Sequence, residues 1–267
     1  MRQTPFTQNE AHYMKKVSWY NDKKLNSAIL NFFEFKKNMI PSGIILDIGC
    51  GVSSIAEPLS KRFETYYGID CSKAMCMEAR KTVNCHFNDN KIFLGDAIKV
   101  ICKNAEITQK TTHILIKNSL QYMDVFWLFD LIASNFNDGV ICQIVLTLRP
   151  DYTQDIYKKI QHVDYVQPPT YYFAKRTIEK IIECDFKFQI LNKRKMPLCQ
   201  SMNFLTWLDY HGAAKAEKKE VIKVISNMHP NELKYYNLEK VGDEYIMKRY
   251  VTLISFCNGV ADEKIYC

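Results

Sequence analysis

The sequence predicts an α/β fold in which a doubly wound, mostly parallel sheet carries helices on both faces. Residues 44–54 are typical of a buried strand, a turn with two glycines and the start of a helix. From there to about residue 147, apolar strand-like runs alternate with helical patterns, as in a parallel sheet. Asp47, Asp70 and Asp96 lie at or beside the ends of three runs. They would therefore share the carboxyl edge of the sheet, where ligands bind.

Periodicity and turn residues give the expected boundaries of the elements. We expect strands at 44–48, 66–70, 91–94, 112–117, 139–147, 186–191 and 250–257. We expect helices at 53–62, 73–82, 97–103, 121–135 and 174–184, after two helices within 7–38. Almost sixty residues separate the last two strands, and they are typical of helices at 202–210, 213–228 and about 231–249. The sheet is therefore expected to carry an insertion.

Composition limits the class of protein. The 267 residues are 47% apolar and 24% charged, which is ordinary for one elaborated globular domain. The ten cysteines are scattered, without a C-x-x-C pair or a zinc-ligand spacing, so we expect reduced thiols, a cytoplasmic location and no metal. The N-terminus lacks a signal-peptide core and no run approaches a membrane span, so no membrane partner is expected.

The net charge of +7 is concentrated late in the chain. Residues 187–250 hold 12 Lys or Arg against 7 Asp or Glu, an excess of +5. These lysines are interspersed with acids, as on a solvated surface. They would also attract an anionic substrate, and the sequence leaves both interpretations open.

The glycine turn has the composition of a nucleotide-binding loop. Gly49 and Gly51 flank Cys50 and allow a sharp turn and close approach of a ligand. Ser54 stands where a dinucleotide-binding motif has its third glycine, which serves helix packing near a pyrophosphate. We therefore expect a ligand without a pyrophosphate. About 21 residues past Gly49, Asp70 ends the second strand, where an acid accepts from ribose hydroxyls.

Four motifs carry a resemblance to a known family. They are Asp47-Ile-Gly-Cys-Gly51, Gly68-Ile-Asp70-Cys-Ser72-Lys-Ala-Met75-Cys-Met-Glu-Ala79-Arg80, Leu94-Gly95-Asp96-Ala97 and Leu120-Gln121-Tyr122-Met123. In this order and spacing, residues 42–150 resemble the class I S-adenosylmethionine-dependent methyltransferases. The resemblance implies a Rossmann-like sheet of seven strands whose last strand is antiparallel and pairs with the sixth. Ser53 and Gln121 depart from it, standing where many members have glycine and histidine.

The resemblance implies that the cofactor is S-adenosyl-L-methionine. Asp70 would accept from the ribose hydroxyls, Asp96 would contact the adenine amino group, and Asp47 would organise the loop or meet the methionyl ammonium. Each acid also has a structural alternative, as a helix cap at Asp70 and Asp96 and as a purely structural group at Asp47. Met75 packs on adenine or in the core, and Cys50 is a spacer. The expected cofactor contacts are Asp47, Gly49, Cys50, Gly51, Asp70, Cys71, Met75, Gly95, Asp96, Ala97 and Asn118.

The candidates for the methyl-transfer step are less specific. Gln121 could orient a substrate oxygen at the sheet edge but cannot take a proton. His211 would end the first helix of the insertion, where it is either a base or a favourable charge for the helix dipole. Tyr172 follows the fifth strand and either faces the methyl group or serves packing. A base is needed only if the nucleophile still holds its proton.

Three parts of the chain are expected. Residues 1–40 would form an N-terminal helical lid, with Tyr13, Trp19 and Tyr20 either lining it or packing in the core. Residues 41–197 and 248–267 would form the cofactor-binding core. Residues 198–247 would form a helical substrate cap, as in small-molecule members of the family that the chain resembles.

Three functions remain in competition at this point. The first is a methyltransferase acting on oxygen or nitrogen of a small polar or anionic molecule, for example a carboxylate or a biosynthetic intermediate. The second is an RNA or protein methyltransferase, which the charge allows. However, Lys117-Asn-Ser-Leu120 stands where an Asn-Pro-Pro-Tyr-like motif would be, so nucleic acid is not the expected partner. The third is a non-catalytic scaffold that binds S-adenosylmethionine. The sequence does not disclose the oligomeric state.

Overall fold

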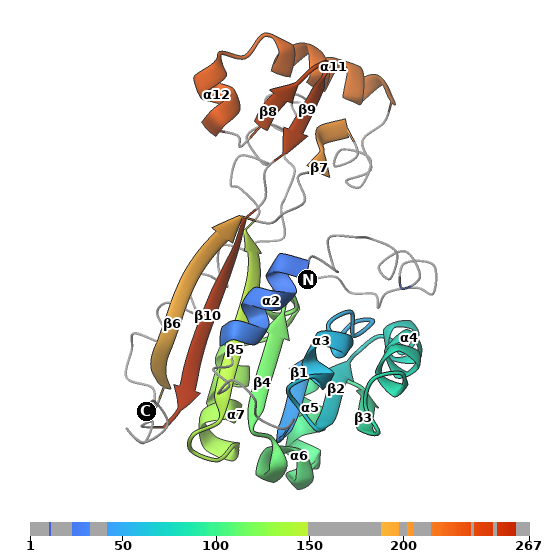
Figure 1. Ribbon diagram of the computed structural model, residues 1–267, viewed down its shortest axis with the longest axis vertical. Helices are drawn as coiled ribbons and strands as arrows, with labels where there is room; N and C mark the ends of the chain where they lie inside the picture. The colour runs from blue at the N-terminus through green and yellow to red at the C-terminus, as the bar shows by residue number, and fades with distance from the viewer. Residues whose placement is uncertain are drawn as a thin grey trace.

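A computed structural model describes residues 11, 23–32, 42–148, 188–197, 202–205, 215–235, 238–247 and 250–259. Its main feature is a seven-stranded sheet in the order β3-β2-β1-β4-β5-β10-β6 (Figure 1). The strands are β1 (Ile44–Ile48), β2 (Thr65–Asp70), β3 (Asp89–Leu94), β4 (His113–Lys117), β5 (Ile141–Leu148), β6 (Phe188–Pro197) and β10 (Tyr250–Asn258). Strands β1 to β5 pair in parallel, and β10 is antiparallel to both β5 and β6. The predicted fold class is therefore confirmed.

Three of the helices around the sheet begin at a side-chain cap. The described helices here are α2 (Lys23–Phe32), α3 (Ala56–Ser60), α4 (Lys73–Asn84), α5 (Ala97–Lys103), α6 (Ala105–Lys110), the 3-10 turn η2 (Leu120–Tyr122) and α7 (Val125–Asn135). Ser72, Asp96 and Asp124 precede α4, α5 and α7, and each side chain accepts a hydrogen bond from a backbone amide three residues on. The helix expected at 121–135 is thus divided: the 3-10 turn η2 ends at Tyr122, Met123 and Asp124 are extended, and α7 begins at Val125.

Two apolar clusters cover the two faces of the sheet. One cluster joins side chains of β1, β4 and β5 to α5, α6 and α7. Phe129 of α7, Phe188 of β6 and Phe256 of β10 form part of it, with ring centroids 5.0–5.6 Å apart. The other cluster joins the opposite face to α2, α3 and α4. Helices on both faces make the sheet doubly wound, and the burial of these side chains is the main stabilising contribution.

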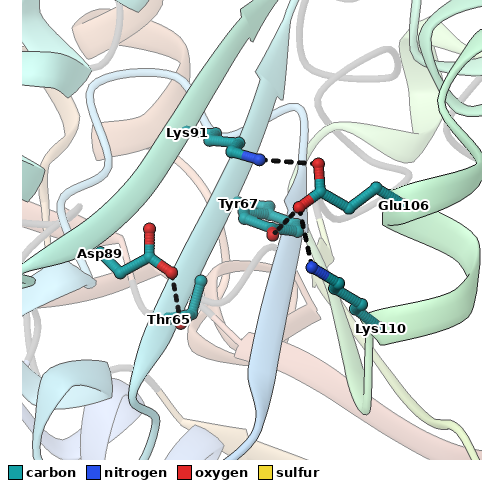
Figure 2. A network of polar contacts seen from close by, with 6 residues as sticks. All are labelled: Thr65, Tyr67, Asp89, Lys91, Glu106 and Lys110. Atoms are coloured by element: carbon teal, nitrogen blue, oxygen red, sulfur yellow. Dashed lines mark hydrogen bonds and ion pairs between the residues drawn. The ribbon is translucent and has the colours of Figure 1, made fainter.

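Polar contacts at the surface attach α6 to the neighbouring strands (Figure 2). Glu106 of α6 accepts from Lys91 Nζ of β3 at 2.7 Å and from Lys110 Nζ at 3.1 Å, and Tyr67 of β2 donates its hydroxyl to the same carboxylate at 3.3 Å. The lysines and Glu106 are exposed to solvent, so we assign this group a modest contribution to stability.

The insertion between β6 and β10 contains a small sheet as well as helices. Its described elements are β7 (Met202–Asn203), α11 (Lys215–Ser226), α12 (Pro230–Tyr235), β8 (Leu238–Val241) and β9 (Glu244–Met247). The strands form an antiparallel sheet in the order β7-β9-β8, beyond one end of β6 and β10 (Figure 1). The helix predicted at 213–228 agrees with α11. Residues 206–214, which hold most of the helix predicted at 202–210, lie outside the described residues.

The single helix predicted over about 231–249 is wrong beyond α12. Val241 pairs with Glu244 across a two-residue turn, in which Gly242 has a φ of 61°. Gly-Asp between two strands is a hairpin signal, and the helical interpretation overlooked it. At the other end of the chain, α2 lies within the predicted helical region 7–38, and Ala11 is the one residue described before it.

Candidate functional site at the carboxyl edge of the sheet

The chain crosses the carboxyl edge of the sheet in the loop after β1. Asp47, one residue before the end of β1, pairs with Gly68 of β2 and with Leu115 of β4. The backbone amides of Gly49 and Cys50 both donate to Ile69 O of β2, at 2.8 and 3.0 Å. These bonds fix the loop across the ends of β1 and β2, as the ligand-binding edge of an open α/β sheet requires.

The two glycines of the loop serve different purposes. A Cβ at Gly49, where φ is 71°, would lie 2.3 Å from Ser119 Cβ, so this glycine is needed for packing against the segment after β4. Gly51 has a φ of 55°, and no atom of the described residues lies within 4 Å of the position that its Cβ would take. Gly51 is therefore where a ligand can approach the backbone.

Asp70 links the glycine loop to the start of α4. Its Oδ2 accepts from the Gly51 amide at 2.9 Å, and its Oδ1 accepts from the Ser72 amide at 2.8 Å. Burial raises the pKa of Asp70, and the two amide bonds oppose that shift. A carboxylate oxygen can accept a second bond, so ribose hydroxyls could still be recognised here.

Asp47 is buried beneath the loop with one oxygen bonded. Its Oδ2 accepts from the Tyr66 hydroxyl at 2.6 Å, and that hydroxyl is also hydrogen-bonded to Ser53 Oγ at 3.0 Å. Asp47 Oδ1 is buried and has no partner among the described residues. Burial raises the pKa of Asp47 to about 6, while the bond from Tyr66 and the charge of Lys117 lower it and Asp70 raises it. Tyr66 is a site residue that was not predicted from the sequence, where the available signal was a phenol in a buried strand.

The third acid caps a helix. Asp96 Oδ1 accepts from the Lys99 amide at the start of α5, at 3.1 Å, and its side chain is exposed. This is the capping role that the sequence left open, and a contact with adenine stays a prediction. The Gly95 amide donates to Asp70 O at 2.9 Å, which brings this turn beside the second strand. Ala97 belongs to the apolar core.

Three further predicted cofactor contacts are Met75, Cys50 and Cys71. Met75 is buried in a small cluster with Val52 and Ala11, so a residue of the N-terminal segment packs against the glycine loop and α4. Burial raises the pKa of the Cys50 thiol far above its usual value, which agrees with the spacer role. Cys71 is exposed beside Asp70.

The segment after β4 continues the same edge. Asn118 has a φ of 55°, and its backbone N–H donates to Val145 O of β5 at 2.9 Å. Lys117 donates its ammonium to Ser54 Oγ at 3.2 Å. Gln121 lies in η2 at this edge, but its side chain is not described. Tyr172 and His211 lie outside the described residues, so their proposed roles stay predictions.

Exposed aromatic side chains gather where α7 begins. Tyr122, Phe126 and Trp127 are 48%, 55% and 64% exposed.

No cluster of His, Cys, Asp or Glu in the described part of the chain forms a metal site. None of the described helices has the length and apolar character needed to cross a bilayer.

The combination of groups fits an elongated ligand with a cationic end and a ribose. Within the described part of the chain, Asp47 Oδ1 is an acceptor without a partner and the backbone at Gly51 is open, and Asp70 ends β2. A loop of this kind after the first strand of a doubly wound sheet defines a nucleoside-binding α/β protein.

Comparison with known proteins agrees with this class. Residues 45–125 match a family model described as a methyltransferase domain. A curated relative from Methanococcus maripaludis, assigned as a decarboxylating cobalt-precorrin-6B C(15)-methyltransferase, is 37% identical over 73 residues. That match spans 26% of this chain and 38% of the relative.

Solved structures share the fold. A candidate methyltransferase from Bacillus halodurans superposes with a TM-score of 0.65 at 12% identity, over 88% of this chain and 99% of the other. The YcgJ protein of Bacillus subtilis gives a TM-score of 0.58 at 12% identity, over 88% and 98%. Residues 45–125 thus carry a methyltransferase domain, with the fold of the S-adenosylmethionine-dependent methyltransferases. The predicted family and its cofactor class are confirmed.

Proposed function

We propose that this protein transfers a methyl group from S-adenosyl-L-methionine to oxygen or nitrogen of a small polar or anionic molecule. The observation that carries the proposal is the arrangement at the end of β1 and β2. A buried carboxylate oxygen that has no partner among the described residues lies below a loop that is open at Gly51, and Asp70 accepts from the backbone amide of Gly51. This arrangement suits the ammonium and ribose of the cofactor.

The chain's own residues would hold the cofactor and the acceptor. Asp47 would accept from the methionyl ammonium, Asp70 would accept from the ribose, and the turn at Asp96 would lie beside adenine. When bound, the cofactor supplies a methyl group already activated on its sulfonium. The remaining task of the protein is to align the acceptor and exclude water. A carboxylate acceptor would need no base, whereas an ammonium must first lose a proton.

Two features support a small acceptor held between parts of the chain. Tyr122, Phe126 and Trp127 offer flat apolar surface at the edge where the acceptor would approach. The late excess of positive charge would favour an anionic molecule. On this proposal residues 198–247 cover the acceptor and residues 1–40 cover the cofactor, and the burial of Ala11 against Val52 supports the second part.

Transfer of labelled methyl groups tests the proposal. The protein would be incubated with methyl-labelled S-adenosylmethionine in three separate reactions, which contain a small-molecule extract, total RNA or denatured protein as the acceptor. We expect label in the small-molecule fraction. Label in RNA that falls steeply with salt would favour a nucleic-acid substrate, and label in protein would favour the other alternative. No transfer to any fraction would favour the scaffold.

A carbon acceptor is the second candidate. The curated relative's name assigns it to C(15) of cobalt-precorrin-6B, and the similarity is 37% over 73 residues. Alkali treatment of the labelled product separates the two candidates where the acceptor is a carboxylate. A methyl ester releases its label as methanol, and a methyl group on carbon stays attached.

A further inference from the structure

Asp47, Tyr66 and Ser53 form a buried hydrogen-bonded group that joins β1, β2 and the glycine loop. The exposed fractions are 2% for Asp47 and 0% for both Tyr66 and Ser53. The Tyr66 hydroxyl lies 2.6 Å from Asp47 Oδ2 and 3.0 Å from Ser53 Oγ. Because the phenol has a single proton, it donates to the carboxylate, and the Ser53 hydroxyl can donate to the phenol oxygen.

The geometry points to Tyr66 as a positioning residue for the cofactor, and this inference rests on the proposed function. Its hydroxyl engages Asp47 Oδ2 and leaves Oδ1 for the methionyl ammonium. An unpaired buried carboxylate oxygen is unfavourable, and a bound cation relieves it. Tyr66 itself would not touch the ligand, so its effect would pass through Asp47 and the loop.

The backbone at Ser53 supports the same inference. Its φ of 53° is in the left-handed region, which is uncommon for a residue with a Cβ. The hydrogen bond to Tyr66 offsets that strain and holds the loop in the shape that leaves Gly51 open. One phenol thus fixes both the carboxylate and the loop above it.

The charged and titratable groups around Asp47 set the pH range of the effect. Tyr66 and Asp70 face it from β2, Lys117 from β4 and Cys50 from the loop. Burial raises the pKa of Asp47 to about 6, and the bond from Tyr66 opposes the rise. Because an ammonium needs an ionised partner, affinity should fall as the pH drops through this value. Without the Tyr66 hydroxyl the fall should begin at a higher pH.

The neighbouring Tyr67 provides a matched control. It lies in the same strand, and its hydroxyl bonds Glu106 at 3.3 Å in the surface group of Figure 2. Tyr67→Phe therefore removes the same atom from the same strand without touching Asp47.

The experiment compares two ligands that differ in the methionyl part. S-adenosylhomocysteine carries the ammonium, and 5′-methylthioadenosine lacks it. Wild type, Tyr66→Phe and Tyr67→Phe would be titrated calorimetrically with both ligands between pH 5.5 and 8. For Tyr66→Phe we expect about tenfold weaker binding of S-adenosylhomocysteine near neutral pH and unchanged binding of methylthioadenosine. Tyr67→Phe should bind both as wild type does.

The outcomes separate the inference from the proposed function. A wild type that binds neither ligand contradicts the proposed function itself. If wild type binds and Tyr66→Phe matches it at every pH, the positioning role is wrong. An equal loss of both ligands also overturns it, since that result means only structural support. If Tyr66→Phe does not fold, the pH dependence of the wild type is the test. A ratio of its affinities for S-adenosylhomocysteine and methylthioadenosine that is constant from pH 5.5 to 8 overturns the inference.

Discussion

At the scale of single residues, we propose that Asp70 makes the most specific contact with the cofactor. It holds the loop through Gly51 and the start of α4 through Ser72, and it ends the strand where a ribose would lie. Charge-assisted hydrogen bonds contribute about 1.5–3 kcal/mol each. Asp70→Ala should therefore weaken binding of S-adenosylmethionine by about tenfold or more in a calorimetric titration.

The control for this change is an acid on the next strand. Asp89→Ala removes an exposed carboxylate of β3 that accepts only from Thr65 among the described residues, at 3.1 Å. It should leave the affinity unchanged. Equal affinities for wild type and a folded Asp70→Ala variant would show that Asp70 does not bind the cofactor.

The two glycines of the loop should respond differently to the same substitution. Gly49→Ala forces a Cβ against Ser119, and overpacking adds to the strain of positive φ, so unfolding should become easier by about 3 kcal/mol or more. Gly51→Ala should lower the free energy of unfolding by only about 1–2 kcal/mol, from the backbone alone. It should, however, weaken binding of the cofactor. Urea unfolding with ligand titration checks both. The reverse order of stabilities would contradict the assigned roles.

Spacing and residue type predicted Asp47, Asp70 and the glycine turn, because a ligand-binding loop needs acids and glycines at set positions. Spacing and residue type could not distinguish the roles of Gly49 and Gly51, because the need for glycine at position 49 comes from packing against Ser119, 70 residues later in the chain. Tyr66 also escaped prediction, because a hydroxyl in an apolar strand acquires its partner only when the strands pair.

At the scale of elements, the middle of the sheet contains a buried polar pair. Gln143 of β5 and Ser255 of β10 are register partners, both buried, and neither side chain has a partner among the described residues. Replacing an unsatisfied buried amide by an apolar group of similar volume removes a desolvation penalty. Gln143→Met should therefore raise the free energy of unfolding by about 1–3 kcal/mol.

An amide in the same sheet whose nitrogen is hydrogen-bonded provides the contrast, although its Oδ1 has no partner among the described residues. Asn258 of β10 donates to Ile132 O at 3.2 Å and to Phe136 O at 3.0 Å, so Asn258→Leu should be destabilising. Urea unfolding of the two variants measures the difference. A loss of stability in Gln143→Met would mean that its amide has a partner, such as buried water.

Element boundaries could be predicted where one pattern dominated. Strand β1 starts and ends where expected because Pro41-Ser42-Gly43 and Gly49 punctuate an apolar run. The prediction for the region after α12 was wrong because its charged residues fit a helix surface as well as a two-sided hairpin. The pairing of β9 with both β8 and β7 decided between the two structures. Local preference alone does not contain that tertiary contact.

At the scale of the whole molecule, the insertion can be removed without breaking the sheet. Pro197 of β6 and Tyr250 of β10 are register partners, so a short link can join the strands there. Replacing residues 201–247 with a short glycine linker should leave cofactor affinity within a few-fold and abolish methyl transfer, if the insertion covers the acceptor. Normal turnover by the folded, shortened protein would refute the cap. Loss of cofactor binding would instead make the insertion part of the cofactor site.

The central claim is that the edge formed by β1, β2 and their loop binds S-adenosylmethionine and not a dinucleotide. Calorimetric titration of the full chain with S-adenosylhomocysteine and with NAD tests it most directly. We predict saturable binding of one S-adenosylhomocysteine per chain and no measurable binding of NAD. Tight binding of NAD, or no binding of S-adenosylhomocysteine by the folded protein, would contradict the account.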